Sequence, residues 1–567
     1  MRFFAMIVGC ILLVCGLPAR GLTQAGGPEM VLIGGKILTL DRTDSVAEAL
    51  AMEHGKISAV GSTTQIRALS GPQTKTVDLG GRTVIPGLID SHIHAIRDAL
   101  YYTTLLDWSE MRDLNAALES VRTAAQKAGP GAWIIVIGGW AKDQIRERRA
   151  PTPQELDAAA PNNPVFIQHL FDFAVLNARA MKALEITAQT KLPPAGNVVT
   201  DANGVPTGIL TGGGSALTFG QLTSKILRPT FAEKVASTRA YFRTFNSLAM
   251  TGIMDEGGIP PSEYWPLFTV WRDGNLTLRV RYDFMAERPK QELADYQSLL
   301  RLMPSDFGDD WLKFVGPGEI VVYGMYDGSL VAKDVKPSEE SKKSLLEFAT
   351  WAAQNRYTIH IHSSHNTNAG EILDVFEEVN RSYPITNLRW AISHVEDASD
   401  STLQRMKALG IGFAVQDRMY FGGDEYMKTH DAAVVHRAPP IMSAMRMGVV
   451  VSGGTDANWV TPYNPFVSLR WLLNGKTLSG TTTRAEQELP SRMEALRMYT
   501  VNSAWMSFDE AERGSLEPNK LADLAVLDRD FMTIPIDEIA ETRSLLTLVG
   551  GKVVYAAGPY EQLGPKH

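Results

Sequence analysis

Short apolar runs alternate with amphipathic stretches through the middle of this 567-residue chain. Runs typical of buried strands occur at residues 84–94, 133–140, 164–170, 277–286, 311–316, 358–362, 388–394, 411–416 and 448–456. Between several of them the apolar residues recur at helical spacing, as in 342–355 and 401–410. This alternation predicts βα units and a parallel sheet. Residues 191–208, which are rich in Pro and Gly, predict an inserted loop.

The two ends of the chain carry a different pattern, in which short apolar runs are separated by glycine turns. Residues 30–41 and 49–61 each predict two strands joined in a hairpin. Residues 547–558 repeat this shape, and residues 521–528 predict one more strand. Strands at both ends, with a long body between them, predict one small β domain built from both chain ends.

The first residues form a separate segment, in which Arg2 precedes an apolar run from Phe3 to Leu17. This pattern predicts a secretory signal peptide, residues 1–27, and hence a secreted or periplasmic protein. The run is short for a membrane span, but an uncleaved membrane anchor and a lipid-anchored form are the alternatives. Cys10 and Cys15, the two cysteines of the chain, both lie in this segment. The mature chain is therefore expected to hold a metal ion without thiolate ligands, and to lack disulfides.

The remaining composition is that of an ordinary soluble protein, with 44% hydrophobic residues and a formal net charge of -8. A mildly acidic chain has no electrostatic footprint for nucleic acid. It also shows no basic run for anionic lipid, and no membrane span is expected after signal cleavage. A small-molecule substrate is the expected partner, and assembly into a homo-oligomer is left open.

Histidines and carboxylates gather at the ends of the predicted strands. His92 and His94 lie one residue apart, so on a strand both side chains point to the same face. Further strand ends carry His360, His362 and His365, His394 with Glu396, Lys313 with Glu319, and Asp456. Functional residues of a βα barrel lie at the C-terminal ends of its strands, and imidazole is the commonest metal ligand. The ordered set predicts one site for zinc or a similar divalent ion.

Each of these residues also has a structural interpretation. A single histidine at a strand end is more often a hydrogen-bonded structural residue, and this applies to His169, His365, His430 and His436. Asp456 could cap the next helix. Spacing does not decide whether His360 or His362 is the ligand. The metal site is favoured by the whole set and by no single member.

Ordered motifs along the chain carry a family resemblance. They include VIPGLIDSHIH (84–94), GGWAKDQIRERRAPTPQELDAAAPNNPVFIQ (138–168), TGIMDEGG (251–258), ISHVEDAS (392–399), SGGTDAN (452–458) and GSLEPNKLADLAVLDRD (514–530). The chain resembles the metal-dependent amidohydrolase superfamily, and more narrowly amidohydrolase family 3, the YtcJ-like branch. The resemblance implies an α/β fold with a (β/α)8 TIM-type barrel, residues 86–510. It also implies a small β-sandwich domain formed by both chain ends, residues 28–85 and 511–567.

The resemblance also implies roles for the strand-end residues. His92 and His94 match the first-strand ligand pair, and His362 and His394 match the ligands on the fifth and sixth strands. Asp456 matches the eighth-strand aspartate, a ligand that also takes a proton from water and passes it to the leaving group.

Many relatives bridge two metal ions with a carbamylated lysine on the fourth strand. Here Lys313 lies inside the predicted strand, whereas Glu319 follows at its mouth and is already a carboxylate. Glu319 is therefore the preferred ligand, and Lys313 is the alternative bridging ligand. One or two divalent ions are expected, with Zn²⁺ the expected metal.

The region around the site departs from the family. Phe173 stands where relatives often have a histidine, and HSSHNTNAG follows the fifth strand in place of the usual glycine-aspartate. Aromatic residues near predicted strand ends are the candidates for an apolar substrate pocket, with core or lid packing as the alternative: Trp140, Phe173, Tyr323 and Trp459.

The expected reaction is hydrolysis of a C–N bond in an amide or an N-substituted formamide-like small molecule. A lactonase or esterase that uses the same metal site is one alternative. A non-catalytic binding protein with the amidohydrolase fold is the other.

Overall fold

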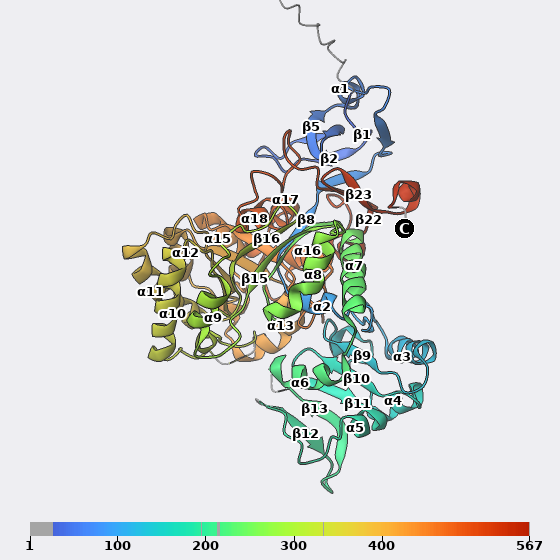
Figure 1. Cartoon of the computed structure of the whole chain (residues 1–567), viewed down its shortest axis with the longest axis vertical. Helices are drawn as coiled ribbons and strands as arrows, with labels where there is room; N and C mark the ends of the chain where they lie inside the picture. Colours follow the sequence, from blue (N-terminus) through green and yellow to red (C-terminus); the bar gives the residue numbers. More distant parts are fainter. Residues whose placement is uncertain (1–26, 194–195, 213–215, 331, 333, 566–567) are drawn as a thin grey trace, which may run out of the picture.

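The computed structural model describes residues 27–193, 196–212, 216–330, 332 and 334–565. The predicted signal peptide, apart from Gly27, lies outside these residues. Three regions follow one another along the longest axis of the molecule (Figure 1). Strands from the chain ends lie at one end, parallel sheets in the middle, and an inserted sheet at the other end. No helix in the described part of the chain is both long and apolar enough to cross a membrane.

Strands from both ends of the chain lie side by side in a six-stranded sheet of order β23-β22-β21-β7-β2-β3. Its strands are β2 (Lys36–Leu38), β3 (Val46–Ala47), β7 (Thr83–Pro86), β21 (Leu524–Leu527), β22 (Ser544–Val549) and β23 (Lys552–Ala556). A four-stranded sheet contains β1 (Met30–Ile33), β4 (Ala49–Glu53), β5 (Lys56–Gly61) and β6 (Lys75–Asp78). Leu32 and Leu50 of this sheet pack with Val84 and Leu546 of the other in one hydrophobic cluster. Burial of these side chains is what joins the two sheets.

The hairpins predicted at 49–61 and 547–558 are confirmed by the antiparallel pairs β4–β5 and β22–β23. The hairpin predicted at 30–41 is wrong, because β1 and β2 belong to different sheets. A Cβ on Gly35 would lie 2.3 Å from Leu79. The glycine pair there lets the chain pass Leu79 closely and cross from one sheet to the other, which an apolar pattern does not distinguish from a turn.

The strand predicted at 84–94 is divided at Gly87. The first part is β7, in the six-stranded sheet, and the second is β8 (Leu88–Ile93), in the middle region. A Cβ on Gly87 would lie 2.1 Å from the side chain of Thr251, so the chain needs glycine to pass here. The break takes the chain directly from the terminal sheets to the site-bearing strand.

Two four-stranded parallel sheets make up the middle region, in the orders β8-β14-β15-β16 and β17-β18-β19-β20. The further strands are β14 (Met250–Asp255), β15 (Arg279–Phe284), β16 (Leu312–Pro317), β17 (His360–Ser363), β18 (Ala391–His394), β19 (Gly412–Gln416) and β20 (Val451–Gly454). Hydrogen bonds join the two sheets: the Asp456 N–H donates to the His92 oxygen at 2.9 Å, and the His362 N–H donates to the Glu319 oxygen at 3.2 Å. These bonds bring strand ends of both sheets together.

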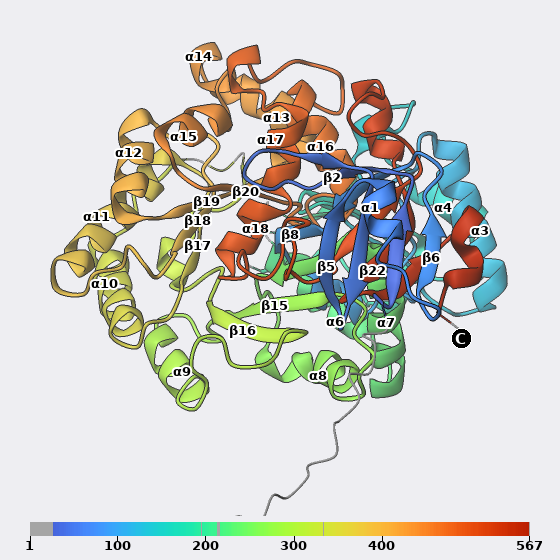
Figure 2. The ribbon, with the colours of Figure 1, turned by 90° about the horizontal axis from the view of Figure 1, so that it is seen from above.

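Helices follow most of these strands and lie outside them, as α9–α12 and α15 do around β15–β20 (Figure 2). They are α2 (Ala95–Ala99), α7 (Phe231–Ser247), α8 (Trp265–Arg272), α9 (Glu292–Leu299), α10 (Glu339–Gln354), α11 (Asn366–Ser382), α12 (Asp400–Leu409), α13 (Arg418–Thr429), α14 (Ala432–Val435), α15 (Ile441–Met447), α16 (Pro465–Asn474), α17 (Arg492–Met498) and α18 (Val501–Met506). The helices predicted from 342–355 and 401–410 are confirmed as α10 and α12. Gly410 ends α12 in the left-handed conformation.

A five-stranded sheet of order β12-β13-β11-β10-β9 is inserted between β8 and β14. It contains β9 (Ile134–Ile137), β10 (Val165–His169), β11 (Phe173–Leu176), β12 (Asn197–Thr200) and β13 (Pro206–Thr211). Its helices are α3 (Leu114–Ala128), α4 (Pro153–Ala159), α5 (Ala178–Ala183) and α6 (Ala216–Ile226). In Figure 1 this unit lies at the far end from β1 and β5.

The inserted sheet corrects two predictions. The runs 133–140 and 164–170 do form strands, but in this separate and mixed sheet, where β10 pairs antiparallel with β11. Residues 191–208 hold β12 and part of β13, so the loop predicted there is wrong. An apolar run predicts a strand without saying which sheet it joins. The strand β14 that completes the middle region was not predicted, because MTGIMD interrupts its apolar residues with glycine and threonine.

Candidate metal centre

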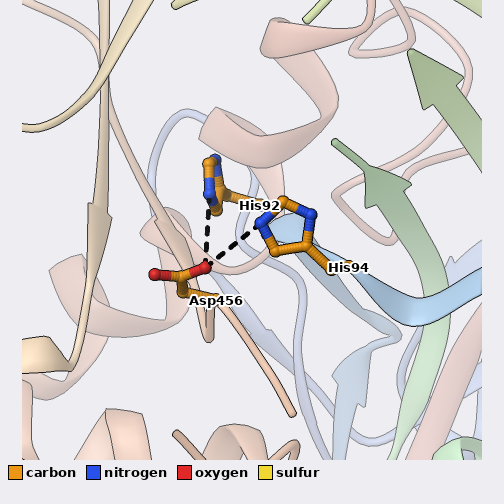
Figure 3. Close-up of side chains that lie close together, drawn as sticks. All are labelled: His92, His94 and Asp456. Carbon is orange, nitrogen blue, oxygen red and sulfur yellow. Dashed lines mark ion pairs between the residues drawn. The ribbon is translucent and has the colours of Figure 1, made fainter. Parts of the chain in front are cut away.

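Two imidazoles and a carboxylate from distant parts of the chain converge at one point. His92 lies near the end of β8, and His94 directly follows that strand. The Asp456 Oδ1 atom lies 3.7 Å from His92 Nε2 and 3.4 Å from His94 Nε2 (Figure 3). All three side chains are buried. The predicted convergence of these residues is therefore present in the structure.

The outward-facing nitrogens of the two imidazoles have their own partners. His94 Nδ1 donates to the Gly257 oxygen at 3.2 Å, and His92 Nδ1 lies 3.1 Å from the Ser393 hydroxyl. A metal-binding histidine usually uses one ring nitrogen in this way, which fixes the ring and turns the other nitrogen toward the ion. His92 Nε2 is buried and has no hydrogen-bond partner among the described residues. An atom of this kind is costly to bury without a ligand.

Glu319 lies beyond the end of β16 and connects the second group of imidazoles. Its Oε1 atom accepts hydrogen bonds from His362 Nδ1 and, at 3.0 Å, from His394 Nε2. Its Oε2 atom lies 3.3 Å from His94 Nε2. His362 Nε2 in turn donates to the Gly328 oxygen at 2.8 Å. Glu319 therefore links ligand candidates from both parallel sheets.

The donor atoms fit a divalent metal ion. Ligand atoms of His92, His94 and Asp456 lie within 4.8 Å of one another, as do those of His92, Glu319 and His394. The two groups share His92, and imidazole nitrogen with carboxylate oxygen is a donor set that suits zinc and related ions.

Charge interactions in the cluster outweigh burial. Burial alone would raise the pKa of Glu319, but the neighbouring His362 and other imidazoles hold that pKa well below its ordinary value. Burial would lower the pKa of His94, yet Asp456 and Glu319 raise it to about 10. The pKa of Asp456 is also held far below normal, against burial, by hydrogen bonds from the imidazoles. Both carboxylates are therefore anionic at neutral pH.

A second buried group, Glu256, Asp283 and His360, lies beside this cluster. His360 Nδ1 lies 2.9 Å from Glu256 Oε1, which is also 3.9 Å from His92 Nδ1. Burial raises the pKa of Glu256 to about 7 and that of Asp283 well above its ordinary value. The structure thus places His362 at Glu319 and His360 in this neighbouring group.

Sequence reasoning missed Glu256 as a site residue, although it lies directly after β14 in the noted motif TGIMDEGG. The strand-end rule would have found it if the strand itself had been recognised.

Lys313 is not brought to the cluster. It is the second residue of β16, and its Nζ atom lies 3.2 Å from Asp509 Oδ1 and 3.8 Å from Asp306 Oδ1. Glu319 follows the other end of the same strand. Lys313 forms an ion pair with Asp509 instead. The sequence does not predict this pair, because the two residues are far apart in the chain.

Two of the four predicted pocket aromatics donate hydrogen bonds to main-chain oxygens. Trp140 is fully buried in the core of the inserted unit, where its ring lies 5.1 Å from that of Trp108 and its Nε1 donates to the Gln168 oxygen at 2.8 Å. The Tyr323 hydroxyl donates to the Ala286 oxygen at 3.0 Å. Trp140 is thus used in packing. Tyr323 is only half-buried, and its lining role stays a prediction.

Three other aromatic residues have different surroundings. Trp459 is half-buried, and the Arg97 guanidinium lies 4.0 Å from the centre of its ring. Phe173 begins β11, the central strand of the inserted sheet, and stacks on His169 with ring centres 4.6 Å apart. Tyr326, whose ring centre is 4.6 Å from that of His362, is 44% exposed. Tyr326 is therefore the aromatic residue that borders both the cluster and solvent.

Comparison with known proteins gives the family of the chain. The sequence profile of the amidohydrolase family matches residues 75–555. An N-substituted formamide deformylase of Arthrobacter pascens is 28% identical over 541 residues, which cover 93% of this chain and 98% of the relative. The protein LONG AFTER FAR-RED 3 of Arabidopsis thaliana is 26% identical, with 94% and 93% covered. The putative amidohydrolase YtcJ of Bacillus subtilis is 22% identical, with 92% and 98% covered.

Solved structures share the fold. A metal-dependent hydrolase of Pyrococcus horikoshii superposes with a TM-score of 0.66 at 22% identity, covering 90% of this chain and 99% of that one. Atrazine chlorohydrolase TrzN from Arthrobacter aurescens, complexed with zinc, gives a TM-score of 0.51 at 15% identity, with 93% and 95% covered. The family match spans most of the sequence, and the predicted resemblance is confirmed: this chain belongs to the amidohydrolase family.

Proposed function

We propose that this protein hydrolyses the C–N bond of a small amide or N-substituted formamide-like substrate. One observation carries the proposal: histidines and carboxylates from both parallel sheets meet in a single buried cluster with an unpartnered imidazole nitrogen on His92. The similarity to an enzyme named for N-substituted formamides supports this substrate class.

The residues proposed to hold the metal are His92, His94, Glu319, His362, His394 and Asp456, with Zn²⁺ as the proposed ion, in one or two copies. His362 would give up one of the two hydrogen bonds that its ring donates, so that one nitrogen offers a lone pair. A bound zinc ion lowers the pKa of water to about 7 and polarises a carbonyl, which supplies hydroxide at neutral pH. The buried imidazoles, already oriented by hydrogen bonds, would bind the ion without thiolate ligands.

Asp456 is proposed as the general base and acid. The Asp456 carboxyl group is anionic at neutral pH, and we propose that it accepts a proton from the attacking water. The same carboxyl group then delivers that proton to the departing nitrogen, a role typically worth about 10²–10⁴ in rate. The Asp90 carboxylate accepts hydrogen bonds from Thr455 Oγ1 at 2.7 Å and from the His92 N–H at 3.1 Å, so it holds both strand ends in register.

The architecture supports a finer proposal for the fold. The two parallel sheets, joined at their edges by the bonds at His92 and His362, are proposed to close into a (β/α)8 barrel within residues 86–510. The two sheets of the chain ends are proposed to form the β-sandwich domain, residues 28–85 and 511–567. Residues 1–27 are proposed as a secretory signal, which N-terminal sequencing of the exported protein would test.

A paired substrate screen tests the function. Metal content is measured first on the purified protein, and hydrolysis is then compared on amides, N-substituted formamides and matched esters. We expect bound metal, faster amide than ester cleavage, and loss of turnover by about 10²-fold or more in Asp456→Asn. The matched control is Asp273→Asn, at a surface aspartate.

Faster ester or lactone cleavage would instead indicate the esterase alternative. A metal-free protein in which Asp456→Asn equals the wild type on every substrate would indicate a binding protein.

A further inference from the structure

A further cluster of metal-ligand residues shares no residue with the candidate centre or with the group of Glu256. It contains His365, Asp397 and His430, whose ligand atoms all lie within 4.8 Å of one another. His365 is the N-cap of α11, Asp397 follows β18, and His430 is the C-cap of α13. Three segments that are separate in sequence therefore bring nitrogen and oxygen donors to one point.

The imidazole of His365 is the strongest sign that something binds there. The residue is fully buried, and neither Nδ1 nor Nε2 has a hydrogen-bond partner among the described residues. A histidine ring with both polar atoms buried and unpaired loses its bonds to water without replacement. A ligand that accepts a nitrogen lone pair would remove this cost.

The geometry of His430 is that of an oriented ligand. Its Nδ1 lies 3.1 Å from the main-chain oxygen of Tyr426, and its ring stacks on the Tyr426 ring with centres 3.7 Å apart. Nδ1 also lies 2.9 Å from the Thr429 hydroxyl. In the tautomer that donates from Nδ1 to these oxygens, Nε2 keeps its lone pair. Metal-binding histidines are commonly fixed by such a bond to a main-chain carbonyl.

Asp397 is held in a similar way. Its Oδ1 atom accepts a hydrogen bond from the Asn366 N–H at 2.6 Å, which anchors the carboxylate beside His365. The other carboxylate oxygen carries the remaining lone pairs. Two imidazoles and one carboxylate are donors that suit zinc and similar transition ions, with water in the remaining positions.

We propose that His365, Asp397 and His430 form a second, structural site for a zinc-class divalent ion. His365 lies three residues after His362, and Asp397 lies three residues after His394. An ion at the second site would therefore fasten the C-terminal end of α13 to the two loops that also carry ligand candidates of the centre. Its role is to hold these loops, and it does not depend on the proposed catalytic function.

Zinc counting tests the proposal. The purified full-length protein is stripped with a chelator, reloaded with ZnCl₂ and desalted. It is then analysed by plasma mass spectrometry together with His430→Gln and Asp397→Asn. We expect each variant to bind one zinc equivalent fewer than the wild type, with affinity at the site weakened more than about 100-fold. The matched control is His436→Gln, an exposed histidine in the same region, which should keep the wild-type count.

Two further measurements decide between outcomes. His94→Gln changes the candidate centre and should keep the zinc ion bound by His365, Asp397 and His430, which His430→Gln loses. This site can therefore be tested even if the proposed function is wrong. Thermal unfolding with and without chelator should show a smaller zinc-dependent rise in Tm for His430→Gln than for wild type. Unchanged zinc in both His430→Gln and Asp397→Asn, or an equal loss in His436→Gln, would overturn the proposal.

Discussion

The main-chain oxygen of His92 accepts a hydrogen bond of 2.9 Å from the main-chain N–H of Asp456. This bond crosses the seam between the two parallel sheets. The backbone therefore sets the separation between a ligand candidate and the proposed base, before any ion binds. Gly454, two residues before Asp456, makes the close approach possible. A Cβ there would lie 2.7 Å from the nitrogen and 2.8 Å from the oxygen of His92.

Gly454→Ala should consequently separate the two sheets at the site. The added methyl group would clash with main-chain atoms, which cannot move away by a change of rotamer. Overpacking of this kind costs about 1–3 kcal/mol. We expect lower stability in urea unfolding and a loss of turnover larger than stability explains. Gly370→Ala is the control, because Gly370 lies in α11 with nothing within 4 Å of its would-be Cβ. Equal, wild-type activity of both variants would show that the approach at Gly454 is not needed.

The two alternative metal ligands from β16, Glu319 and carbamylated Lys313, lie at opposite ends of that strand. Glu319 contacts three imidazoles at one end, and Lys313 pairs with Asp509 at the other. We expect Glu319→Gln to lose bound metal and turnover, since the amide that replaces the carboxylate carries no charge. Lys313→Met should keep both. Measuring metal content and kcat on the two variants gives the answer, and the opposite pattern would restore Lys313 as the bridging residue.

The strand-end chemistry was predictable because it depends on local order. His92, His362, His394 and Asp456 each follow an apolar run, and parallel strands end at the same edge, so the residues meet. The sequence could not place Trp140, because its run looks like a strand of the body and its partners lie within the inserted unit. It could not place Lys313 either.

The inserted sheet shows why the assignment of strands to sheets could not be predicted from the sequence. Strands β9 and β10 pair in parallel, as barrel strands do, and only β11–β13 turn the sheet into a mixed one. The choice between sheets is made by tertiary packing, such as the Phe166–Phe219 contact with ring centres 6.3 Å apart. The local pattern of apolar residues does not show which sheet a strand will join.

Asp509 anchors the C-terminal part of the chain to Arg281 of β15. Its Oδ2 accepts hydrogen bonds from Arg281 Nε and Arg513 Nη2, both at 2.7 Å, and all three side chains are buried. Asp509→Asn would leave two guanidinium groups buried without a counter-charge. Breaking a buried pair in this way costs about 3–5 kcal/mol. Urea unfolding should show that loss, and Asp528→Asn, a more exposed aspartate, should not.

The same carboxylate gives an acid dependence with a defined sign. Burial raises the pKa of Asp509, but Arg513 and Arg281 outweigh it and hold that pKa well below the ordinary value. A group with a depressed folded-state pKa stabilises fully above its unfolded value of about 3.9, and this contribution is lost as the pH falls toward the folded-state pKa. The free energy of unfolding should fall below about pH 4, with a smaller slope in Asp509→Asn. Identical slopes would contradict the assignment.

Trp459 and Trp140 should respond differently to truncation, although both were candidates for the pocket. Trp140→Ala removes a fully buried indole and should destabilise the protein by about 3–5 kcal/mol. Trp459 is half-buried, three residues after Asp456, and its contact with Arg97 is worth about 0.5–2 kcal/mol. Trp459→Ala should therefore fold with a small stability loss and raise KM for aromatic amides more than for formamide. Steady-state kinetics on both substrates would check this, and an unchanged KM ratio would place Trp459 outside the substrate pocket.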